Sequence, residues 1–333
     1  MPHDHDPSLQ RIAIVGAGAI GGWLGARLAA AGCAVSVLAR GATLAALRSH
    51  GLRLRSAAGD ITVPVQASSN AAELGPQDVV IVAVKAPALA EVAAQIGPLL
   101  GPQTLVVTAM NGVPWWFLHG LGPRWAGQRI ACTDPDGRIA QALPLAQVVG
   151  CVVHASCAVE EPGLIRHHFG AGLILGEAHG QPSARVEALV ALLQGAGLAA
   201  SASAQIQKDI WFKLWGNMTM NPVSALTGAT ADRILDDELV RGFINRVMLE
   251  AQAIGTELGL PINQQPDDRH AVTRKLGAFK TSMLQDVEAG KPIELDALVS
   301  AVRELGQLTG TATPYTDALL GLMRLRAQVL GLY

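Results

Sequence analysis

The chain has 333 residues, of which half are hydrophobic and 16% are charged, and its 25 basic and 27 acidic side chains give a formal net charge of −2. This balance argues against the positive field expected of proteins that bind nucleic acid or an anionic membrane surface. No apolar run approaches the roughly 18 residues of a membrane-spanning helix, and the length predicts two domains with sizeable cores.

The first ten residues and the cysteines give no sign of export or of a metal site. MPHDHDPSLQ lacks the basic-then-apolar order of a signal peptide, so we expect a cytosolic protein. His3 and His5 alternate with aspartates, for which a frayed polar tail is a simpler interpretation than metal binding. The four cysteines form no CxxC pair and are expected to be small, mostly buried side chains with reduced thiols: Cys33, Cys132, Cys151 and Cys157.

A glycine-rich turn follows the first predicted strand, residues 11–15. Its residues are Gly16, Ala17, Gly18, Ala19, Ile20 and Gly21, and a helical pattern and a second strand come next. Gly16 permits a tight turn, Gly18 lets the backbone approach a pyrophosphate, and Gly21 lets the helix pack close to the strand. The strand–turn–helix setting predicts a dinucleotide site at the helix N-terminus. The alternative is an ordinary turn with glycines for packing.

The second predicted strand ends at Arg40, nineteen residues after Gly21. A fold that prefers NAD usually has Asp or Glu near this position, where the carboxylate holds the ribose 2′-hydroxyl. A guanidinium suits a 2′-phosphate instead, because it forms charge-assisted bidentate hydrogen bonds. Arg40 therefore favours NADP, and the alternative is a solvated arginine without a ligand.

Two polar residues follow later predicted strands. Lys85 closes the strand 78–84, and Asn111 comes after the strand 104–108. Ligands of open α/β sheets bind outside the carboxyl ends of the strands, so both residues are candidates for cofactor or substrate contact. On position alone, Lys85 is equally well a surface lysine, and Asn111 could instead cap a following helix.

The middle of the chain predicts further β-structure. Residues 52–54 and 61–65 alternate around a Gly-Asp turn, as in a small hairpin. Residues 151–159 are predicted to form a strand, and after a turn at 160–163 the stretches LIRHHF and LILGE predict two more. We expect these strands to extend the sheet in antiparallel fashion. Ser183 is predicted to cap the helix that follows it.

From about residue 205 the pattern is helical to the end of the chain. The predicted helices are 205–226, 238–258, 264–276, a short piece near 282, 294–308 and 316–330. In the first of them Lys213, Asn217 and Asn221 recur every fourth residue, which places them on one face of a largely apolar helix. Buried polar groups need partners, so this stripe should meet either protein or substrate. Pro222 is expected to kink or stop the helix.

Two further polar residues have alternative interpretations. Glu294 lies at the predicted start of a helix, where a carboxylate is favourable for the helix dipole, or it could be the partner of Lys213. Ser282 is predicted to cap a short helix, or it could contact a ligand. Spacing alone does not decide between these alternatives.

The motifs together resemble the ketopantoate reductase (2-dehydropantoate 2-reductase) family over nearly the whole chain. The similar stretches are GAGAIG, AVKAPAL, MNGV, EPGLIRH, KDIWFKLWGNMTMNPVSALTG, SMLQD and GKPIELDAL. The Lys–Asn–Asn–Pro segment and SMLQD are more specific to this family than the glycine turn. The resemblance implies an α/β Rossmann-type dinucleotide-binding domain at 1–204. It also implies an all-α C-terminal domain, like that of 6-phosphogluconate dehydrogenase, at 205–333.

The resemblance also implies roles for individual residues. Lys213 matches the catalytic lysine and general acid, and Glu294 matches its acidic partner. Asn111, Asn217, Asn221 and Ser282 match substrate-contacting positions. Lys85 matches a lysine near cofactor and substrate, Arg40 matches the arginine that favours NADPH, and Asn111 is also a candidate for cofactor contact. No metal site is implied.

The implied reaction is the NADPH-dependent reduction of ketopantoate to pantoate, a step toward pantothenate and coenzyme A. The alternatives are a related NAD(P)-dependent reductase of a different 2-keto or hydroxy acid, and a non-catalytic NADP(H) sensor. A sensor would need the glycine turn but not a proton donor. The sequence allows a homodimer without fixing the oligomeric state.

Two departures from the family pattern concern the substrate. The stretch 129–149, with the turn 134–137, is longer than the corresponding connection in compact family members. Tryptophans add bulk beside the motifs: Trp115, Trp116, Trp211 and Trp215. Both features leave the chemistry unchanged and the identity of the keto acid open.

Overall fold

A computed structural model describes residues 9–333, which divide into two compact units. The first unit contains the described residues up to Met110 together with Asp136–Ile206, and the second contains Asn111–Pro135 together with Gln207–Tyr333. The segment 111–135 thus groups with the helices, although the sequence-based boundary at 204/205 put it in the first domain. The histidines near the start of the chain, His3 and His5, lie outside the described residues.

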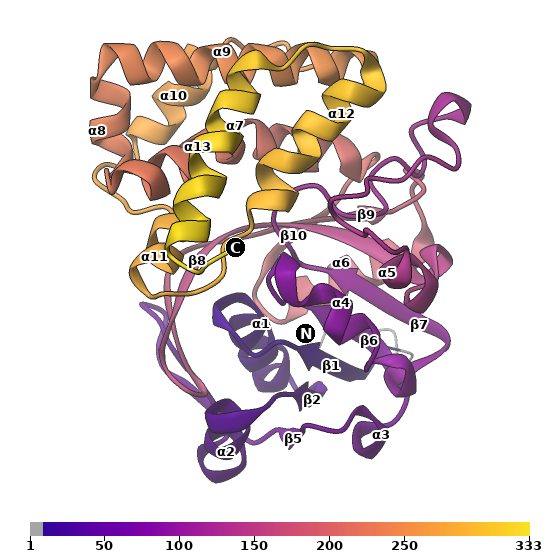
Figure 1. The fold of residues 1–333 in the computed structure, drawn as a ribbon. Helices are drawn as coiled ribbons and strands as arrows, with labels where there is room; N and C mark the ends of the chain where they lie inside the picture. Colours follow the sequence, from indigo (N-terminus) through magenta and orange to yellow (C-terminus); the bar gives the residue numbers. More distant parts are fainter. Residues whose placement is uncertain (1–8) are drawn as a thin grey trace. The chain divides into compact units, whose positions relative to one another are not determined.

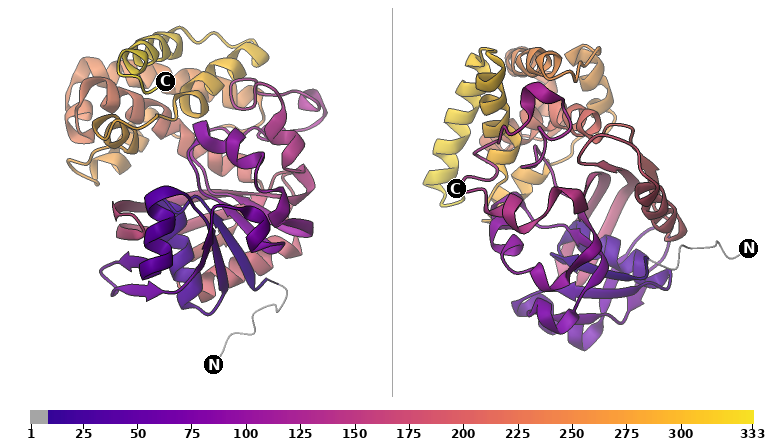
Figure 2. Two further views of the ribbon diagram at one scale, coloured as in Figure 1. Left: turned by 60° about the horizontal axis from the view of Figure 1, so that its bottom comes forward. Right: turned by 90° about the vertical axis from the view of Figure 1, so that its right-hand side faces the viewer.

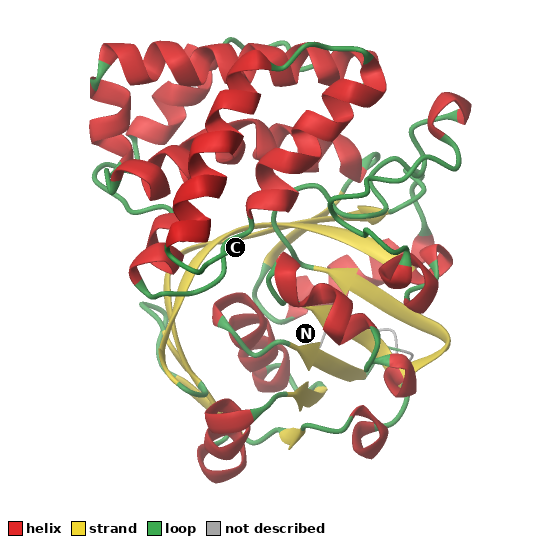
Figure 3. Ribbon diagram, viewed as in Figure 1, coloured by secondary structure: helices red, strands yellow, loops and turns green. Residues whose placement is uncertain are grey.

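The first unit is built on a single mixed sheet (Figures 1 and 3). Within the described residues the strand order is β4-β3-β9-β8-β7-β6-β1-β2-β5, and β10 pairs with β9. The strands are β1 (Arg11–Val15), β2 (Ala34–Leu38), β3 (Leu52–Arg55), β4 (Ile61–Val63), β5 (Gln66–Ser68), β6 (Gln77–Val82), β7 (Leu100–Thr108), β8 (Val148–Glu161), β9 (Leu164–Glu177) and β10 (Ala199–Ala202).

Helices flank this sheet. They are α1 (Ala19–Ala30), α2 (Gly41–His50), α3 (Ala71–Leu74), α4 (Leu89–Ala93), α5 (Arg138–Ala142) and α6 (Ala184–Gly195), with short 3₁₀ turns η1 (Ala86–Ala88), η2 (Gly97–Leu99) and η4 (Leu145–Gln147). The sheet curls, so that α1 contacts strands as distant in the sheet order as β2 and β4. Figure 1 shows the long strands β8 and β9 curving past α1.

The central strands of the sheet are parallel and in register at their carboxyl ends. Val15 at the end of β1 pairs with Leu38 of β2 on one side and with Val82 of β6 on the other. β1 is buried, and its residues Ile12 and Ile14 are fully inaccessible to solvent. The loops after β1, β2 and β6 therefore begin at the same edge of the sheet, where ligands of such folds bind.

The antiparallel extension is confirmed, but it has two long strands where three were expected. β9 runs without interruption through both LIRHHF and LILGE, opposite β8. The β8–β9 register is irregular between His154 and Ser156 and at neighbouring positions. These irregularities lie opposite Gly170, where the alternating hydrophobic pattern of the sequence is interrupted. A bulge keeps a strand paired while changing its local alternation, so the sequence pattern indicated an end where the strand only bends.

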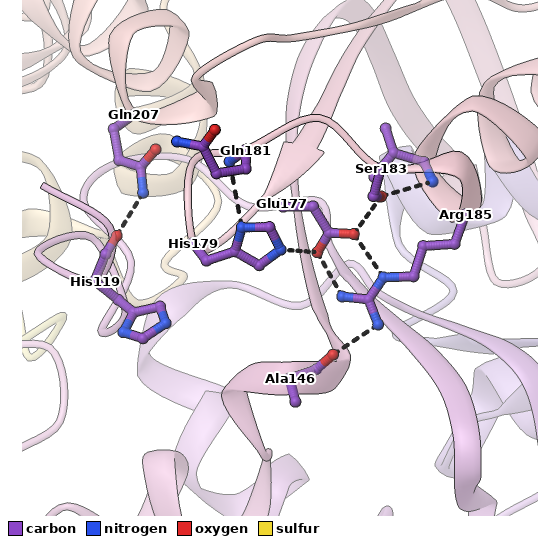
Figure 4. A network of polar contacts seen from close by, with 9 residues as sticks. His119, Ala146, Glu177, His179, Gln181, Ser183, Arg185 and Gln207 are labelled. Atoms are coloured by element: carbon purple, nitrogen blue, oxygen red, sulfur yellow. Dashed lines mark hydrogen bonds and ion pairs between the residues drawn. The ribbon is translucent and has the colours of Figure 1, made fainter.

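A partly buried ion pair joins the end of β9 to the start of α6 (Figure 4). The Glu177 side chain, 1% exposed, accepts hydrogen bonds from Arg185 Nε at 2.6 Å and from Arg185 Nη2 at 2.5 Å. Ser183 donates to the same carboxylate and, as predicted, caps α6 by accepting a hydrogen bond from the Val186 amide. Burial raises the pKa of Glu177, but the hydrogen bonds from Arg185 and Ser183 outweigh it and hold that pKa below its usual range.

The second unit is helical, as expected, and all strands of the described chain belong to the first unit (Figure 3). Its elements are η3 (Pro123–Trp125), α7 (Ile206–Thr227), α8 (Ala231–Asp236), α9 (Glu238–Glu257), α10 (Pro266–Arg274), α11 (Ser282–Glu288), a π-helical turn (Asp296–Ser300), α12 (Ala301–Thr309) and α13 (Pro314–Val329). None of the helices between residues 9 and 333 is both long enough and apolar enough to cross a membrane.

The helix α7 is the buried core of this unit. Trp211 and Trp215 are each 1% exposed, and the Trp215 indole donates to the Met248 carbonyl of α9 at 2.9 Å. α9 in turn contacts α8, α10, α12 and α13, and Figures 1 and 2 show the last two running side by side. Gln207 ties the segment 111–135 to α7 through a 2.7 Å hydrogen bond to the His119 carbonyl (Figure 4).

The helix predicted at 205–226 is confirmed as α7, which does not stop at Pro222 but continues to Thr227. Burial of neighbours such as Met218 and Val223 outweighs one lost backbone hydrogen bond, and a kink at Pro222 stays a prediction. The helix predicted at 294–308 is also confirmed, with a π-helical turn that leads directly into α12. The helix expected directly after Asn111 was wrong, because that stretch forms turns.

Candidate active site

The glycine turn after β1 has the backbone geometry expected of a phosphate cradle. Gly16 has φ +92°, and a Cβ there would lie 2.6 Å from Val84 Cγ1. A Cβ on Gly21 would lie 2.1 Å from the Gly16 carbonyl oxygen, so α1 can begin this close to β1 only with glycine at that position. The close-packing role predicted for Gly21 is thus visible in the fold.

The start of α1 is open to a ligand. Gly18 is the N-cap of this helix and supplies no side chain to satisfy the first-turn amides. A Cβ on Gly18 would meet nothing within 4 Å, so the space beside the turn is unfilled by protein. Uncapped amides and the helix dipole together attract an anion. The residues present therefore fit the pyrophosphate of a dinucleotide, with Ala17, Ala19 and Ile20 completing the turn.

Lys85 and Arg40 lie at the same edge of the sheet. Lys85 follows β6, is half-buried and occupies the N-cap position of η1. Arg40 follows β2 at the N-cap position of α2, with its side chain 61% exposed. The positions predicted for both residues beyond strand ends are therefore correct.

Arg40 has a partner that sequence reasoning missed. Its guanidinium is ion-paired with Glu91 of α4: Nη1 contacts Oε1, and Nη2 donates to Oε2 at 3.4 Å. A hydrogen bond and the attraction between the charges raise the pKa of Arg40 and lower the pKa of Glu91. The two residues are 51 positions apart in the chain, and no local pattern links them.

In the second unit, Lys213 lies against Asn111. The Lys213 Nζ donates a 2.7 Å hydrogen bond to Asn111 Oδ1, between residues 102 positions apart in the chain. A residue from the turn after β7 and a residue of α7 are thus brought together. Both residues are only partly buried.

The stripe predicted on α7 is present. Lys213 and Asn217 are half-buried, and Asn221 is 6% exposed. Neither the Asn217 nor the Asn221 amide forms a hydrogen bond with another residue of the described chain. Neither amide is among the side-chain groups of the described residues that are fully buried without a hydrogen-bond partner, so their polar atoms are accessible. A lysine and two amides on one helix face, with accessible polar atoms, can bind a small polar ligand.

A π-helical turn fixes the backbone next to Asn111. The Val113 amide donates to the Ala297 carbonyl at 2.8 Å. Gly112, between Asn111 and Val113, has φ +81°, and a Cβ there would lie 2.5 Å from the Ala297 oxygen. Glycine is therefore required at this contact by both conformation and space. π-Helical turns are rare and frequent at functional sites, and this one positions the residue that contacts Lys213.

Side-chain bonds support the same π-helical turn. Asp296 accepts hydrogen bonds from Ser300 at 2.8 Å and from the Tyr333 hydroxyl at 2.7 Å. Burial and the hydrogen bond to Asp296 raise the pKa of Tyr333 to about 12. The last residue of the chain thus anchors the turn that contacts Gly112.

Glu294 and Ser282 are placed differently from expectation. Glu294, 8% exposed, precedes the helix instead of lying in its first turn, and its carbonyl accepts the Leu298 amide at 3.2 Å. Thr281, not Ser282, caps α11, because the Thr281 hydroxyl accepts the Leu284 amide. Ser282 is exposed in the first helical position. The pairing of Glu294 with Lys213 and the ligand contact of Ser282 stay predictions.

The tryptophans near the motifs belong largely to the core of the second unit. Trp115 is 7% exposed and Trp116 is 2% exposed. Trp211 packs against Phe117, with ring centroids 5.8 Å apart. Their bulk therefore contributes first to packing.

Comparisons with known proteins extend over both units. Residues 12–115 match the family model described as ketopantoate reductase PanE/ApbA, and residues 205–327 match the model of its C-terminal part. The chain is 48% identical over 324 residues to the 2-dehydropantoate 2-reductase of Mesorhizobium japonicum, covering 97% of this chain and 99% of that protein.

Solved structures show the same fold. A crystal structure from Ralstonia solanacearum MolK2, provisionally named a ketopantoate reductase, is 62% identical with a TM-score of 0.94 and covers 98% of this chain and 100% of that one. The ternary structure of a D-mandelate dehydrogenase with NADH and anilino(oxo)acetate has a TM-score of 0.82 at 20% identity, covering 97% and 99% of the two chains. The latter similarity concerns the fold alone.

Proposed function

The chain belongs to the ketopantoate reductase family, and we propose that it reduces 2-dehydropantoate to pantoate with NADPH, using Lys213 as the general acid. The observation that carries the proposal is the Lys213–Asn111 hydrogen bond, beside two amides on the same helix face that have no hydrogen-bond partner within residues 9–333. The 48% identical relative named 2-dehydropantoate 2-reductase supports the choice of substrate.

In the proposed reaction Lys213 acts on the carbonyl oxygen of the keto acid. NADPH, when bound, supplies the hydride that C2 receives, and the carbonyl oxygen then gains negative charge. The Lys213 ammonium stabilises that charge more in the transition state than in the ground state, and donates the proton that completes the alcohol. Asn111 holds the ammonium in place through its side-chain oxygen.

The remaining polar residues would orient the substrate and tune the lysine. Asn217 and Asn221 offer amide donors and acceptors for the carboxylate and the hydroxyl group, and Ser282 is proposed to join them. Glu294 is proposed to pair with Lys213 and to favour its protonated form. Well-aligned orientation of reacting groups contributes on the order of 7–11 kcal/mol to barrier reduction.

The cofactor residues are proposed from the first unit. The turn from Gly16 to Gly21 would hold the pyrophosphate, and Arg40 would bind the 2′-phosphate that distinguishes NADPH from NADH. Lys85 of the same unit is proposed to contact the nicotinamide half, and Asn111, which belongs to the second unit, is a separate candidate for cofactor contact. Support for these roles comes from the uncapped start of α1 and from the common edge at which β1, β2 and β6 end.

The decisive experiment replaces Lys213 with alanine. We expect kcat for ketopantoate to fall at least about a hundredfold, the low end for loss of a general acid, while the Kd for NADPH changes little. Lys208→Ala is the matched control, because Lys208 is an exposed lysine of the same helix. Near-normal turnover by Lys213→Ala, or an equal loss in both variants, would end the assignment.

A second substrate is a specific alternative. A fold this similar serves a D-mandelate dehydrogenase, so the same proton donor could act on a different 2-keto acid. Comparison of keto acids at equal enzyme concentration separates the two. The cytosolic location and a homodimer stay predictions.

A further inference from the structure

The Arg40–Glu91 pair lies where a dinucleotide fold discriminates its cofactor. Arg40 follows β2, the position from which such folds contact the adenosine 2′-substituent. Glu91 reaches it from α4, which follows β6. Because β1 lies between β2 and β6 with its carboxyl end in register with both, the pair spans the edge where the glycine turn begins.

Glu91 is oriented toward Arg40 by a neighbour. Gln95 Nε2 donates to Glu91 Oε1 at 3.3 Å, so the carboxylate receives bonds from both residues. The pair is solvent-accessible, since the Arg40 and Glu91 side chains are 61% and 52% exposed. Exposed ion pairs are weak, and a ligand with a stronger charge can therefore displace the carboxylate.

A 2′-phosphate and the Glu91 carboxylate would compete for one guanidinium. The phosphate carries close to two negative charges and prefers the same bidentate geometry. NADH has a 2′-hydroxyl instead, which can donate to a carboxylate, as it does in folds with an acid at this edge. We propose that Glu91 is a specificity-determining residue that competes with the 2′-phosphate for Arg40 and so lowers the preference for NADPH over NADH.

The expected size of the effect follows from the charges involved. A single and a double negative charge about 5 Å apart in water, screened at physiological salt, repel enough to weaken binding about fivefold. Removing the charge of Glu91 should therefore strengthen NADPH binding by about that factor. NADH binding should stay the same or weaken, because the 2′-hydroxyl loses an acceptor of full charge.

The test is the Kd of the full-length protein for NADPH and for NADH, measured by nicotinamide fluorescence without substrate. The variants are Glu91→Gln, Arg40→Ala, and the double variant. Glu187→Gln is the control, because it removes one exposed charge from α6 of the same unit. We expect Glu91→Gln to tighten NADPH about fivefold, while Glu187→Gln leaves both constants within about twofold.

The double variant identifies the route of the effect. With Arg40 replaced, Glu91 loses the partner that holds it at the 2′-position, so Glu91→Gln should then change the NADPH constant less than about twofold. An unchanged NADPH constant in Glu91→Gln, or equal shifts for NADPH and NADH, would overturn the proposal. The inference rests on the proposed dinucleotide function but not on the keto acid, because binding is measured without substrate. The binding constants for NADPH and NADH therefore test this inference even if the protein does not reduce ketopantoate.

Discussion

Gly112→Ala tests whether the π-helical turn positions the proposed proton donor. A Cβ on Gly112 would lie 2.5 Å from the Ala297 carbonyl oxygen and 2.7 Å from the Ala297 Cβ. Ordinary contacts begin at 3.4 Å, so the turn must move by nearly an ångström. Asn111 would move with it, and the 2.7 Å hydrogen bond to Lys213 would lengthen or break.

The expected loss of stability in Gly112→Ala has a conformational part and a steric part. An alanine at φ +81° costs about 1–2 kcal/mol, and overpacking against backbone adds about 1–3 kcal/mol. We therefore expect a loss of about 2–5 kcal/mol in the free energy of unfolding. A 1 Å misplacement near reacting groups can cost about a hundredfold in rate, so kcat should fall between about tenfold and a hundredfold.

Gly127→Ala separates the two parts. Gly127 belongs to the same unit and has φ +76°, but a Cβ there would meet nothing within 4 Å. It should lose only about 1–2 kcal/mol of stability and keep its kcat. Urea unfolding and steady-state NADPH oxidation measure both quantities. If the two variants lose stability and kcat equally, the contact with Ala297 does not position Asn111.

Three further predictions concern other parts of the fold. In Gly21→Ala the new Cβ would lie 2.1 Å from the Gly16 carbonyl oxygen. The variant should bind both NADPH and NADH at least about tenfold more weakly, as measured by fluorescence titration. Unchanged dissociation constants would show that the glycine turn does not hold the pyrophosphate. Glu177→Gln should cost about 2–3 kcal/mol in urea unfolding, less than a fully buried pair because the Arg185 side chain is 36% exposed. The pKa of Glu177 is lowered in the folded state. The stabilisation by its carboxylate is therefore present above about pH 4.3, the usual pKa of a glutamate, and is lost as the pH falls through the lowered pKa. A difference in stability between native protein and variant that persists at strongly acidic pH would contradict this. Burial raises the pKa of the Cys157 thiol to about 12, so alkylation of this residue at pH 8, followed by mass spectrometry, should be slow until the chain is unfolded, and rapid native labelling would show the burial to be incorrect.

Local patterns predicted the cofactor half of the fold well. The glycine turn, Arg40 and Lys85 stand directly beyond strands whose buried β-branched runs are readable from sequence. The stripe from Lys213 to Asn221 was likewise predicted, because residues four apart share a helix face whatever the tertiary context. Ser183 was predicted as a cap from its residue type and position, and the structure confirms it.

Tertiary contacts were beyond the sequence. The pairing of Arg40 with Glu91 and that of Lys213 with Asn111 join residues 51 and 102 positions apart. No periodicity signals that 111–135 groups with helices that follow much later. The cap of α11 is Thr281, one residue before the predicted Ser282. Both residue types are good helix caps, so the sequence does not show at which of the two the helical backbone begins. Glu294 lies one residue before its helix, and the π-helical turn that begins at Asp296 was not predicted from the sequence.

The most direct test of the central claim is the rate of NADPH oxidation with ketopantoate, set beside 2-keto acids that lack its hydroxyl group. Sites that hydrogen-bond a substrate hydroxyl discriminate strongly against analogues without it. If the Asn217 and Asn221 amides bind the substrate as proposed, kcat/KM for ketopantoate should exceed that for each analogue by at least about a hundredfold. An analogue reduced as efficiently as ketopantoate would contradict the proposed substrate, and no reduction of any 2-keto acid would contradict the proposed reaction.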